Sequence, residues 1–436
     1  MLANKRILVS WYTDPRYIPP FQLSDRQVVV GPKMAADQPQ MMFAGRTPTG
    51  SYDLMEALES QRIATQYDAI VVWTDATGTN LPTNLDAFDC PKVLCVGDTH
   101  HRESPLRSVL GYASGNRFDF IVLSYSRHHL HWFQQAGLSN LAWIPGLPVR
   151  HIEHPAPASK IPGVAFVGNM QKYHPRRLRL IETLHAEQIP LLAISNTREI
   201  SAEIFASSLV SFNASLNGDL NMRVFEILSA GGCLLTDRLA PQSGLDLCLK
   251  EGTEFLGYDN AEEMVAQARF LLDHHDIADR IARNGHSAFL DRMQPKRRAN
   301  DLMTWVFKGR LNDLYRPGGD ARLHRTEKTV PLQKRLEIYE ALQELHRQLE
   351  RPRFLFWSDV PEIFISDASD LTRADLSVVD AGGGVARTPD APDIDGRPHG
   401  TKVDAGQILR SEWDCVVARA NAAIPDGVRR TRLLTV

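Results

Sequence analysis

The chain is predicted to be an α/β protein with two doubly wound parallel-sheet domains in tandem and a smaller α/β appendage at the C-terminus. Three observations predict this class. Short apolar runs alternate with helical stretches through the first 310 residues, the runs are continuously apolar, and a proline-rich seam divides them into two series. Continuous Val, Ile and Leu runs indicate strands of a parallel sheet that is covered on both faces.

The first series occupies residues 1–150. Five apolar runs predict its buried strands: RILVSWY (6–12), QVVVG (27–31), DAIVVWTD (68–75), KVLCVGDTHH (92–101) and DFIVLSYS (119–126). Residues 51–66 and 127–137 predict intervening helices, and Gly137 would end the second one because glycine readily adopts the conformation of a helix C-terminus. This series predicts a first Rossmann-like domain.

The second series follows a seam with five prolines, IPGLPVRHIEHPAPASKIPG (144–163), which is typical of an interdomain linker. We expect a second Rossmann-like domain over 151–310, with two late helices that end near His274–His275 and near Gly285. The two domains would face each other across a cleft, and ligands of such sheets bind beyond the carboxyl ends of the strands. The remaining elements are expected as strands at 164–170, 190–195, 208–215 and 232–237 and helices near 176–188 and 221–230.

The tail, residues 311–436, has a different composition. It contains one strongly helical stretch at 331–351 and a long Pro-, Gly- and Asp-rich loop at 385–406. The turn DAGGG lacks the GxGxxG spacing of nucleotide-binding turns. We therefore expect an appendage with a structural or protein-contacting role, with strands at 353–358, 375–384 and 413–421.

Charge and cysteine usage exclude several classes. A net charge of −3 argues against an obligate nucleic-acid binder. The five cysteines are scattered without CxxC spacing, which suits reduced thiols rather than a disulfide framework or a zinc site. No signal-peptide pattern opens the chain, and no apolar run reaches the ~18 residues of a membrane helix. We expect a cytoplasmic protein, and the sequence leaves its oligomeric state open.

The strongest functional signal is the stretch NMRVFEILSAGGCLLTD, Asn221 to Asp237. A small polar loop precedes a helix that carries Asn221, Arg223 and Glu226 in its first turns. The unpaired amides of a helix N-terminus favour a diphosphate, and a carboxylate can accept two ribose hydroxyls at once. The alternative is a surface acid paired with Arg223 at spacing i,i+3. The whole string favours a nucleotide-binding site.

A second group of donor-binding candidates lies in GNMQKYHPRR, just after a strand. The backbone of Gly168 and Asn169 would face the diphosphate. Lys172, Arg176 and Arg177 would neutralise the charge that develops on the leaving nucleotide. A solvated basic helix start is the alternative, although basic residues are disfavoured at a helix N-terminus unless an anion is present.

The first domain would bind the acceptor. VGDTHHRES (96–104) follows a buried strand, so Asp98, His100 and His101 project from its carboxyl end. An inverting transfer needs a general base for the acceptor hydroxyl, and histidine suits pH 7. His100 or Asp98 is the preferred candidate, and Asp14, after the first strand, is another. Each could instead make loop hydrogen bonds only.

A metal site is not expected. His128, His129 and His131 lie close together in RHHLHWF, but side chains at spacing i,i+2 diverge on a helix and no carboxylate follows at ligand spacing.

The segment RVFEILSAGGCLLTDRLAP closely resembles the donor-binding segment of GT-B glycosyltransferases, in particular the spore-maturation CgeB-like group. The similarity extends over FLGYDNAEEMVAQARFLLDHHDIADRIARNGHSAFLDR and VAFVGNMQKYHPRRLRLIETL, about 160–310 in all. It implies the GT-B fold, a nucleoside diphosphate sugar as donor, a hydroxyl of a glycan, protein or other acceptor, and chemistry without a metal or other cofactor. Retaining relatives often carry a Glu-x7-Glu pair; Glu226 fits its second position, but Gly218 occupies the first, so retention or inversion stays open.

Two competing functions stay open beside glycosyl transfer. A nucleotide-sugar epimerase on the same architecture would change the donor alone. A two-lobed sugar-binding protein would close on its ligand without turnover, but that class is usually exported. A hydride-transfer enzyme is disfavoured because no strand is followed by GxGxxG.

Overall fold

Two compact units make up the chain, the first formed by residues 1–169, 181–215 and 219–324 and the second by residues 170–180, 216–218 and 325–436. The structure is a computed structural model. It describes residues 4–13, 23–34, 43–100, 104–149, 157, 159–170, 174–195, 198–317, 323, 325, 328–357, 360–371, 374–379, 412–420, 422, 424 and 428–436.

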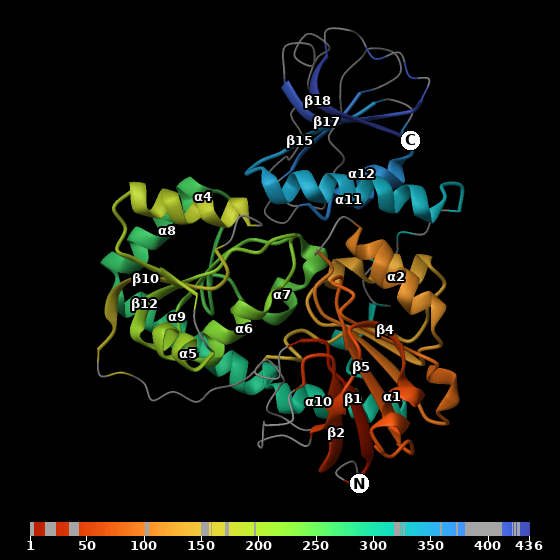
Figure 1. Cartoon of the computed structure of the whole chain (residues 1–436). Coiled ribbons are helices and arrows are strands. Elements are labelled where there is room, and N and C mark those ends of the chain that lie inside the picture. Colours follow the sequence, from red (N-terminus) through yellow and green to blue (C-terminus); the bar gives the residue numbers. More distant parts are fainter. Residues whose placement is uncertain are drawn as a thin grey trace. The chain divides into compact units, whose positions relative to one another are not determined.

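A seven-stranded parallel sheet opens the first unit. Its spatial order is β3-β2-β1-β5-β7-β8-β9. The chain adds strands on one side of β1 and then on the other, so the topological switch point lies between β1 and β5 (Figure 1). The strands are β1 Arg6–Ser10, β2 Arg26–Gly31, β3 Phe43–Arg46, β5 Ala69–Thr74, β7 Lys92–Val96, β8 Phe120–Leu123 and β9 Leu141–Trp143.

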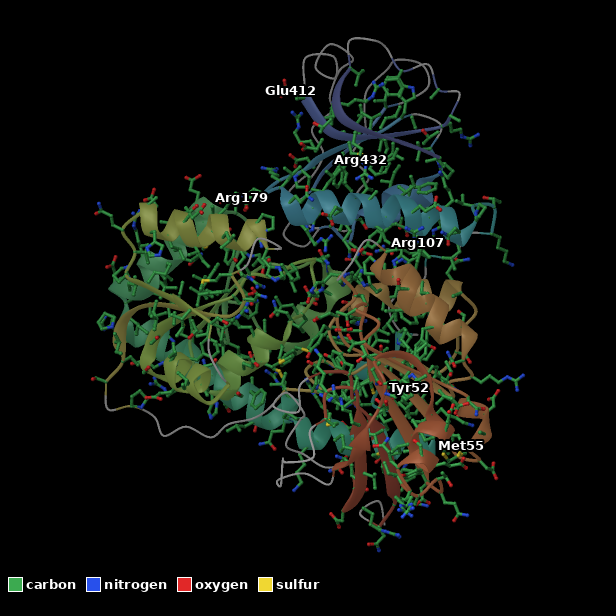
Figure 2. The ribbon with its side chains drawn as sticks, in the orientation of Figure 1. Tyr52, Met55, Arg107, Arg179, Glu412 and Arg432 are labelled. Atoms are coloured by element: carbon green, nitrogen blue, oxygen red, sulfur yellow. The ribbon has the colours of Figure 1, made fainter. Side chains whose placement is uncertain are left out.

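A two-stranded parallel sheet, β4 (Gly50–Asp53) with β6 (Asn80–Thr83), accompanies it. Tyr52, labelled in Figure 2, lies on β4, and its hydroxyl is 3.0 Å from Ser10 Oγ and donates to Asn80 Oδ1 at 2.8 Å. These buried bonds join the small sheet to β1. The helices of this region are α1 Leu54–Ser60, η2 Leu85–Ala87, α2 Pro105–Gly115, η3 Arg127–His129 and α3 Leu130–Gln135.

A five-stranded parallel sheet follows, in the order β11-β10-β12-β13-β14. Its switch point lies between β10 and β12, because β11 and β12 lie on opposite sides of β10. Helices α5 and α6 pack against each other and against strands of this sheet (Figure 1). The elements are β10 Ile161–Val167, α4 Pro175–Ala186, β11 Leu191–Ile194, α5 Arg198–Ser207, β12 Ser208–Phe212, α6 Met222–Ser229, β13 Leu234–Asp237, η4 Pro241–Ser243, α7 Leu245–Cys248, β14 Leu256–Tyr258, α8 Ala261–Asp273, α9 His275–Ala288 and the π-helical turn η5 Phe289–Met293.

The long helix α10 (Pro295–Lys308) follows the second sheet in sequence but packs on the first sheet. Its buried Leu302, Met303 and Val306 share one core with Ile7 of β1 and Val29 of β2 (Figure 1). Burial of apolar side chains of this size stabilises the contact by about 1.5–3 kcal/mol each. The η6 turn (Asp313–Tyr315) follows it.

The predicted end of a helix near Gly285 is wrong. Helix α9 runs through this position to Ala288. A Cβ on Gly285 would lie 2.6 Å from the carbonyl oxygen of Glu254 and 2.7 Å from Leu228 Cδ2, so glycine is needed here for close packing rather than for termination. Gly137 does end α3 as predicted, with φ +81.

The second unit contains a four-stranded parallel sheet in the order β16-β15-β17-β18. Glu412 and Arg432, labelled in Figure 2, mark β17 and β18. The elements are α11 Leu332–Gln348, β15 Arg353–Phe356, α12 Glu362–Ala368, β16 Asp375–Val378, β17 Glu412–Ala418 and β18 Arg429–Thr435. The predicted loop at 385–406 lies outside the described residues.

The predicted fold class is confirmed by these parallel sheets. No helix within the described residues is both long and apolar enough to span a membrane.

Candidate active site

The side chain of Arg223 lies across the switch point of the second sheet. It projects from the first turn of α6, and its Nε donates to Val167 O at 2.7 Å, where β10 ends. Its Nη1 donates to Asn213 Oδ1 at 3.0 Å, just beyond β12. The guanidinium also lies 4.5 Å from the ring centroid of Phe166. Arg223 therefore joins the two strand ends between which doubly wound sheets bind ligands.

The Nη2 atom of Arg223 packs against Gly168. A Cβ at Gly168 would lie 2.0 Å from Arg223 Nη2. Only glycine leaves room for the Arg223 side chain at this position, so Nη2 lies directly against the backbone that follows β10. Two residues that the sequence predicts for donor binding are brought into contact here.

Glu226 is half-buried on α6, one turn beyond Arg223. Burial lowers the pKa of Arg223 to about 10, and the Glu226 carboxylate is the strongest opposing influence, followed by Asp219. Among the described residues no carboxylate forms an ion pair with Arg223. The cation therefore persists at neutral pH beside carboxylates that act on it without hydrogen bonding to it.

The loop before α6 is fixed by a buried acid. Asp237, at the end of β13, accepts hydrogen bonds from Ser215 N at 3.0 Å and from Ser215 Oγ at 2.7 Å. Asn221 is the N-cap of α6 rather than part of its first turn, and its side chain makes no capping hydrogen bond. Its Oδ1 is buried without a hydrogen-bond partner among the described residues. The first amides of α6 thus lack the usual side-chain cap.

A cluster of three titratable side chains joins loops from both sheets. The ligand atoms of Asp98, His100 and Asp219 lie within 4.8 Å of one another. Asp98 and His100 follow β7 of the first sheet, and Asp219 lies in the loop before α6 of the second. His100 and Asp219 are buried, and Asp98 is half-buried. Carboxylates this close to an imidazole can orient it and stabilise its protonated form.

The remaining sequence-predicted residues are Asn169, Arg176, Asp14, His101 and Lys172. Asn169 is exposed after β10. Arg176 belongs to the second unit, where its Nε lies 3.7 Å from Glu350 Oε2. Asp14, His101 and Lys172 lie outside the described residues.

Sequence reasoning missed Asp219, Asn213 and Asp237. Asp219 had a signal, because it is the acid of the small polar loop before α6. Asp237 had one too, as the acid at the end of a buried strand. Asn213 had none, since its contact with Arg223 depends on the order of the strands in space.

Comparison with known proteins gives one family match. Residues 185–304, from the end of α4 into α10, match the family described as glycosyl transferase-like. The predicted enzyme class, a glycosyltransferase, is confirmed by this match. The matched segment contains Asp219, Arg223 and Glu226. No match to the chain was found among curated proteins.

Several solved structures are similar to the chain. Anabaena HepE in complex with UDP-glucose is 13% identical, with a TM-score of 0.47, over 70% of this chain and 100% of that one. Sucrose-phosphate synthase from Thermosynechococcus elongatus is 10% identical, with a TM-score of 0.48, over 69% and 97%. A Rickettsia africae glycosyltransferase is 9% identical, with a TM-score of 0.45, over 70% and 100%. These values are low, so the fold assignment rests on the chain's own sheets.

Proposed function

We propose that the chain transfers a sugar from a nucleoside diphosphate sugar to a hydroxyl group of a glycan, protein or other acceptor, without a metal ion. The observation that carries this proposal is the position of Arg223. A cation bonded to neutral acceptors spans the switch point of the second sheet, and Nη2 lies next to the backbone after β10. Such a cation is suited to bind an anion.

The donor would lie along α6 and the end of β10. Nη2 of Arg223, the first amides of α6 and the backbone at Gly168 and Asn169 would hold the diphosphate. Glu226 would accept the ribose hydroxyls, and Asn221 Oδ1 would accept a further donor hydrogen. Lys172 and Arg176 stay predicted donor-binding residues from the sequence pattern.

The transfer step follows from the cluster of Asp98, His100 and Asp219. The acceptor oxygen bonds to the anomeric carbon while the bond from that carbon to the diphosphate breaks, and its electron pair leaves with the nucleotide. His100 would take the acceptor proton, and the two carboxylates would stabilise the imidazolium. Asp14 stays the second candidate for the base. Arg223 would stabilise the charge on the leaving group.

We also propose the finer assignments that the resemblance implies. The chain would be CgeB-like and cytoplasmic, with an acceptor domain at 1–150, a donor domain at 151–310 and an appendage at 311–436. All five cysteines are free thiols, which supports a reducing compartment.

Release of nucleoside diphosphate from a panel of donors, UDP-glucose among them, tests the proposal. We expect release that depends on an added acceptor and persists in EDTA. Change of the donor alone would indicate an epimerase, and binding without turnover would indicate a sugar-binding protein. Activity that EDTA abolishes and Mn²⁺ restores would overturn metal independence, and Asp98, His100 and Asp219 would then be the candidate ligands.

A further inference from the structure

The segment Tyr125–His129, here called the 125–129 segment, follows β8 and is buried throughout. Its residues are Tyr125, Ser126, Arg127, His128 and His129, none more than 3% exposed. Burying so many polar side chains is costly unless they are hydrogen-bonded. The hydrogen bonds of the segment therefore indicate which neighbouring residues it positions.

Its first contact is with Thr99, the residue between Asp98 and His100. Thr99 Oγ1 lies 2.9 Å from Ser126 Oγ and 2.8 Å from His129 Nδ1. If Nδ1 accepts, the Thr99 hydroxyl donates to it and accepts from Ser126; if Nδ1 donates, Thr99 accepts from His129. Either tautomer fixes Thr99 at two points.

Its second contact is with the loop that carries Asp219. Leu220 N, the amide next to Asp219, donates to Tyr125 O at 3.2 Å. The segment thus bonds to the neighbours of all three residues of the cluster.

Its third contact reaches the loop after β13. Arg127 Nη1 donates to Gln242 O at 3.2 Å, and its guanidinium lies 5.6 Å from the ring centroid of Trp143. Gly244 has φ +80, and a Cβ there would lie 2.7 Å from Trp143 Cη2 and 2.8 Å from Arg127 Cδ. This close approach anchors the segment itself.

We propose that the 125–129 segment is the positioning element of the transfer step, holding Asp98 and His100 through Thr99 and Asp219 through Leu220. This inference rests on the proposed function, because positioning matters only if His100 takes the acceptor proton. A displacement of about 1 Å at a reacting group can lower turnover about 100-fold. Ser126, Thr99 and His129 are therefore assigned as positioning residues, which act through Asp98 and His100.

The protonation of His129 suits this role. Burial, followed by the neighbouring His128, His131 and His100, holds the pKa of His129 well below its ordinary value of 6.5. A neutral ring keeps its bond to Thr99 without placing a second positive charge beside His100 when that residue is protonated.

The test is Thr99→Val, which keeps the shape of the side chain and removes the hydroxyl. We expect kcat to fall about 10- to 100-fold with donor KM unchanged, because donor binding does not involve Thr99. Thr99→Ser keeps the hydroxyl and should restore most of kcat. Ser126→Ala removes one bond and should give a smaller fall. Thr83→Val is the matched control: it removes a hydroxyl that donates to Tyr52 O at 3.0 Å on the small sheet and should leave kcat unchanged.

The outcomes separate this inference from the proposed function. If the wild-type chain releases no nucleotide with any donor and acceptor, the proposed function fails. If wild type turns over and Thr99→Val keeps full kcat, or if Thr99→Ser falls as far as Thr99→Val, the positioning role is overturned. Thermal unfolding of every variant should be measured in parallel. If the drop in kcat matched the drop in folded fraction, a purely structural role would replace the one proposed.

Discussion

Arg325 and Arg335 of the second unit and Arg223 of the first unit are held by different kinds of acceptor. In the second unit, Arg335 forms two hydrogen bonds with Asp367, at 3.0 and 2.7 Å, and Arg325 forms two with Asp370, at 2.9 and 2.8 Å. In the first unit, the acceptors of Arg223 are a carbonyl and an amide oxygen.

The pKa values of Arg325 and Arg223 shift in opposite directions. Burial alone would lower the pKa of Arg325, but the Asp370 carboxylate outweighs it and the pKa is raised. At Arg223 burial prevails, and the pKa falls to about 10. A paired buried cation has its charge neutralised and serves the fold. A cation held by neutral atoms keeps its charge for a ligand, which supports the proposed donor-binding role of Arg223 and offers no such support for Arg335.

The largest effect should come from breaking a pair in the second unit. Asp367→Ala leaves the charge of Arg335 buried without its partner and should lower the free energy of unfolding by about 3–5 kcal/mol. Donor KM of the folded fraction should not change. Asp375→Ala is the control, because it breaks an exposed pair with Arg351 that contributes about 0–1 kcal/mol. Urea unfolding and donor kinetics measure both. An equally small loss of unfolding free energy in the two variants would show that the Arg335–Asp367 pair does not stabilise the fold.

Glu226→Ala should act on the donor and not on the fold. Loss of a charged hydrogen-bond acceptor costs about 1.5–3 kcal/mol, so donor KM should rise about 10- to 150-fold. Glu203→Ala, an exposed position on α5, should leave KM unchanged. Steady-state kinetics with varied donor measure the effect. Unchanged donor affinity in Glu226→Ala would remove the role assigned to Glu226.

Gly168→Ala tests the position of Arg223 without removing its charge. The new methyl group would meet Nη2 and displace the guanidinium, at a cost of about 1–3 kcal/mol. Donor KM should rise, less than for Glu226→Ala. Gly111→Ala on α2, where a Cβ meets nothing within 4 Å, is the matched control. Equal donor KM values for the two variants would show that Arg223 Nη2 does not contact the donor.

His129→Asn tests the lowered pKa of His129 through the pH dependence of the free energy of unfolding. Because the folded pKa lies below 6.5, the stability that a neutral His129 contributes is fully present above that pH. Below it the unfolded chain binds a proton that the folded chain does not, so stability falls by about 1.4 kcal/mol per pH unit. The stability difference between wild type and variant should therefore shrink from pH 7 to pH 5. A constant difference would show that His129 titrates normally in the fold.

Apolar strands were predictable because buried parallel strands are continuous in hydrophobicity. RILVS, AIVVWT and KVLCV all form strands where expected. Strand β18, RRTRLLT, was missed because it lies at the edge of its sheet and its basic residues break the continuous apolar run that marks a buried strand. The packing of α10 on the first sheet was also missed, since periodicity gives a helix its apolar face but not the sheet it covers.

Residue types were predictable at the site, but their spatial neighbours were not. Arg223, Glu226 and Gly168 stood out from local pattern alone. The contact of Arg223 with Asn213 and that of Thr99 with His129 depend on strand order, which no local pattern encodes. Asp219 meets His100 only because loops of two sheets converge.

The role of Arg223 in donor binding would be decided by a structure of the chain with a bound nucleoside diphosphate. We expect the diphosphate within hydrogen-bond distance of Arg223 Nη2 and the first amides of α6, with the ribose hydroxyls on Glu226. A nucleotide bound elsewhere, with Arg223 Nη2 and Glu226 contacting none of it, would rule this donor site out.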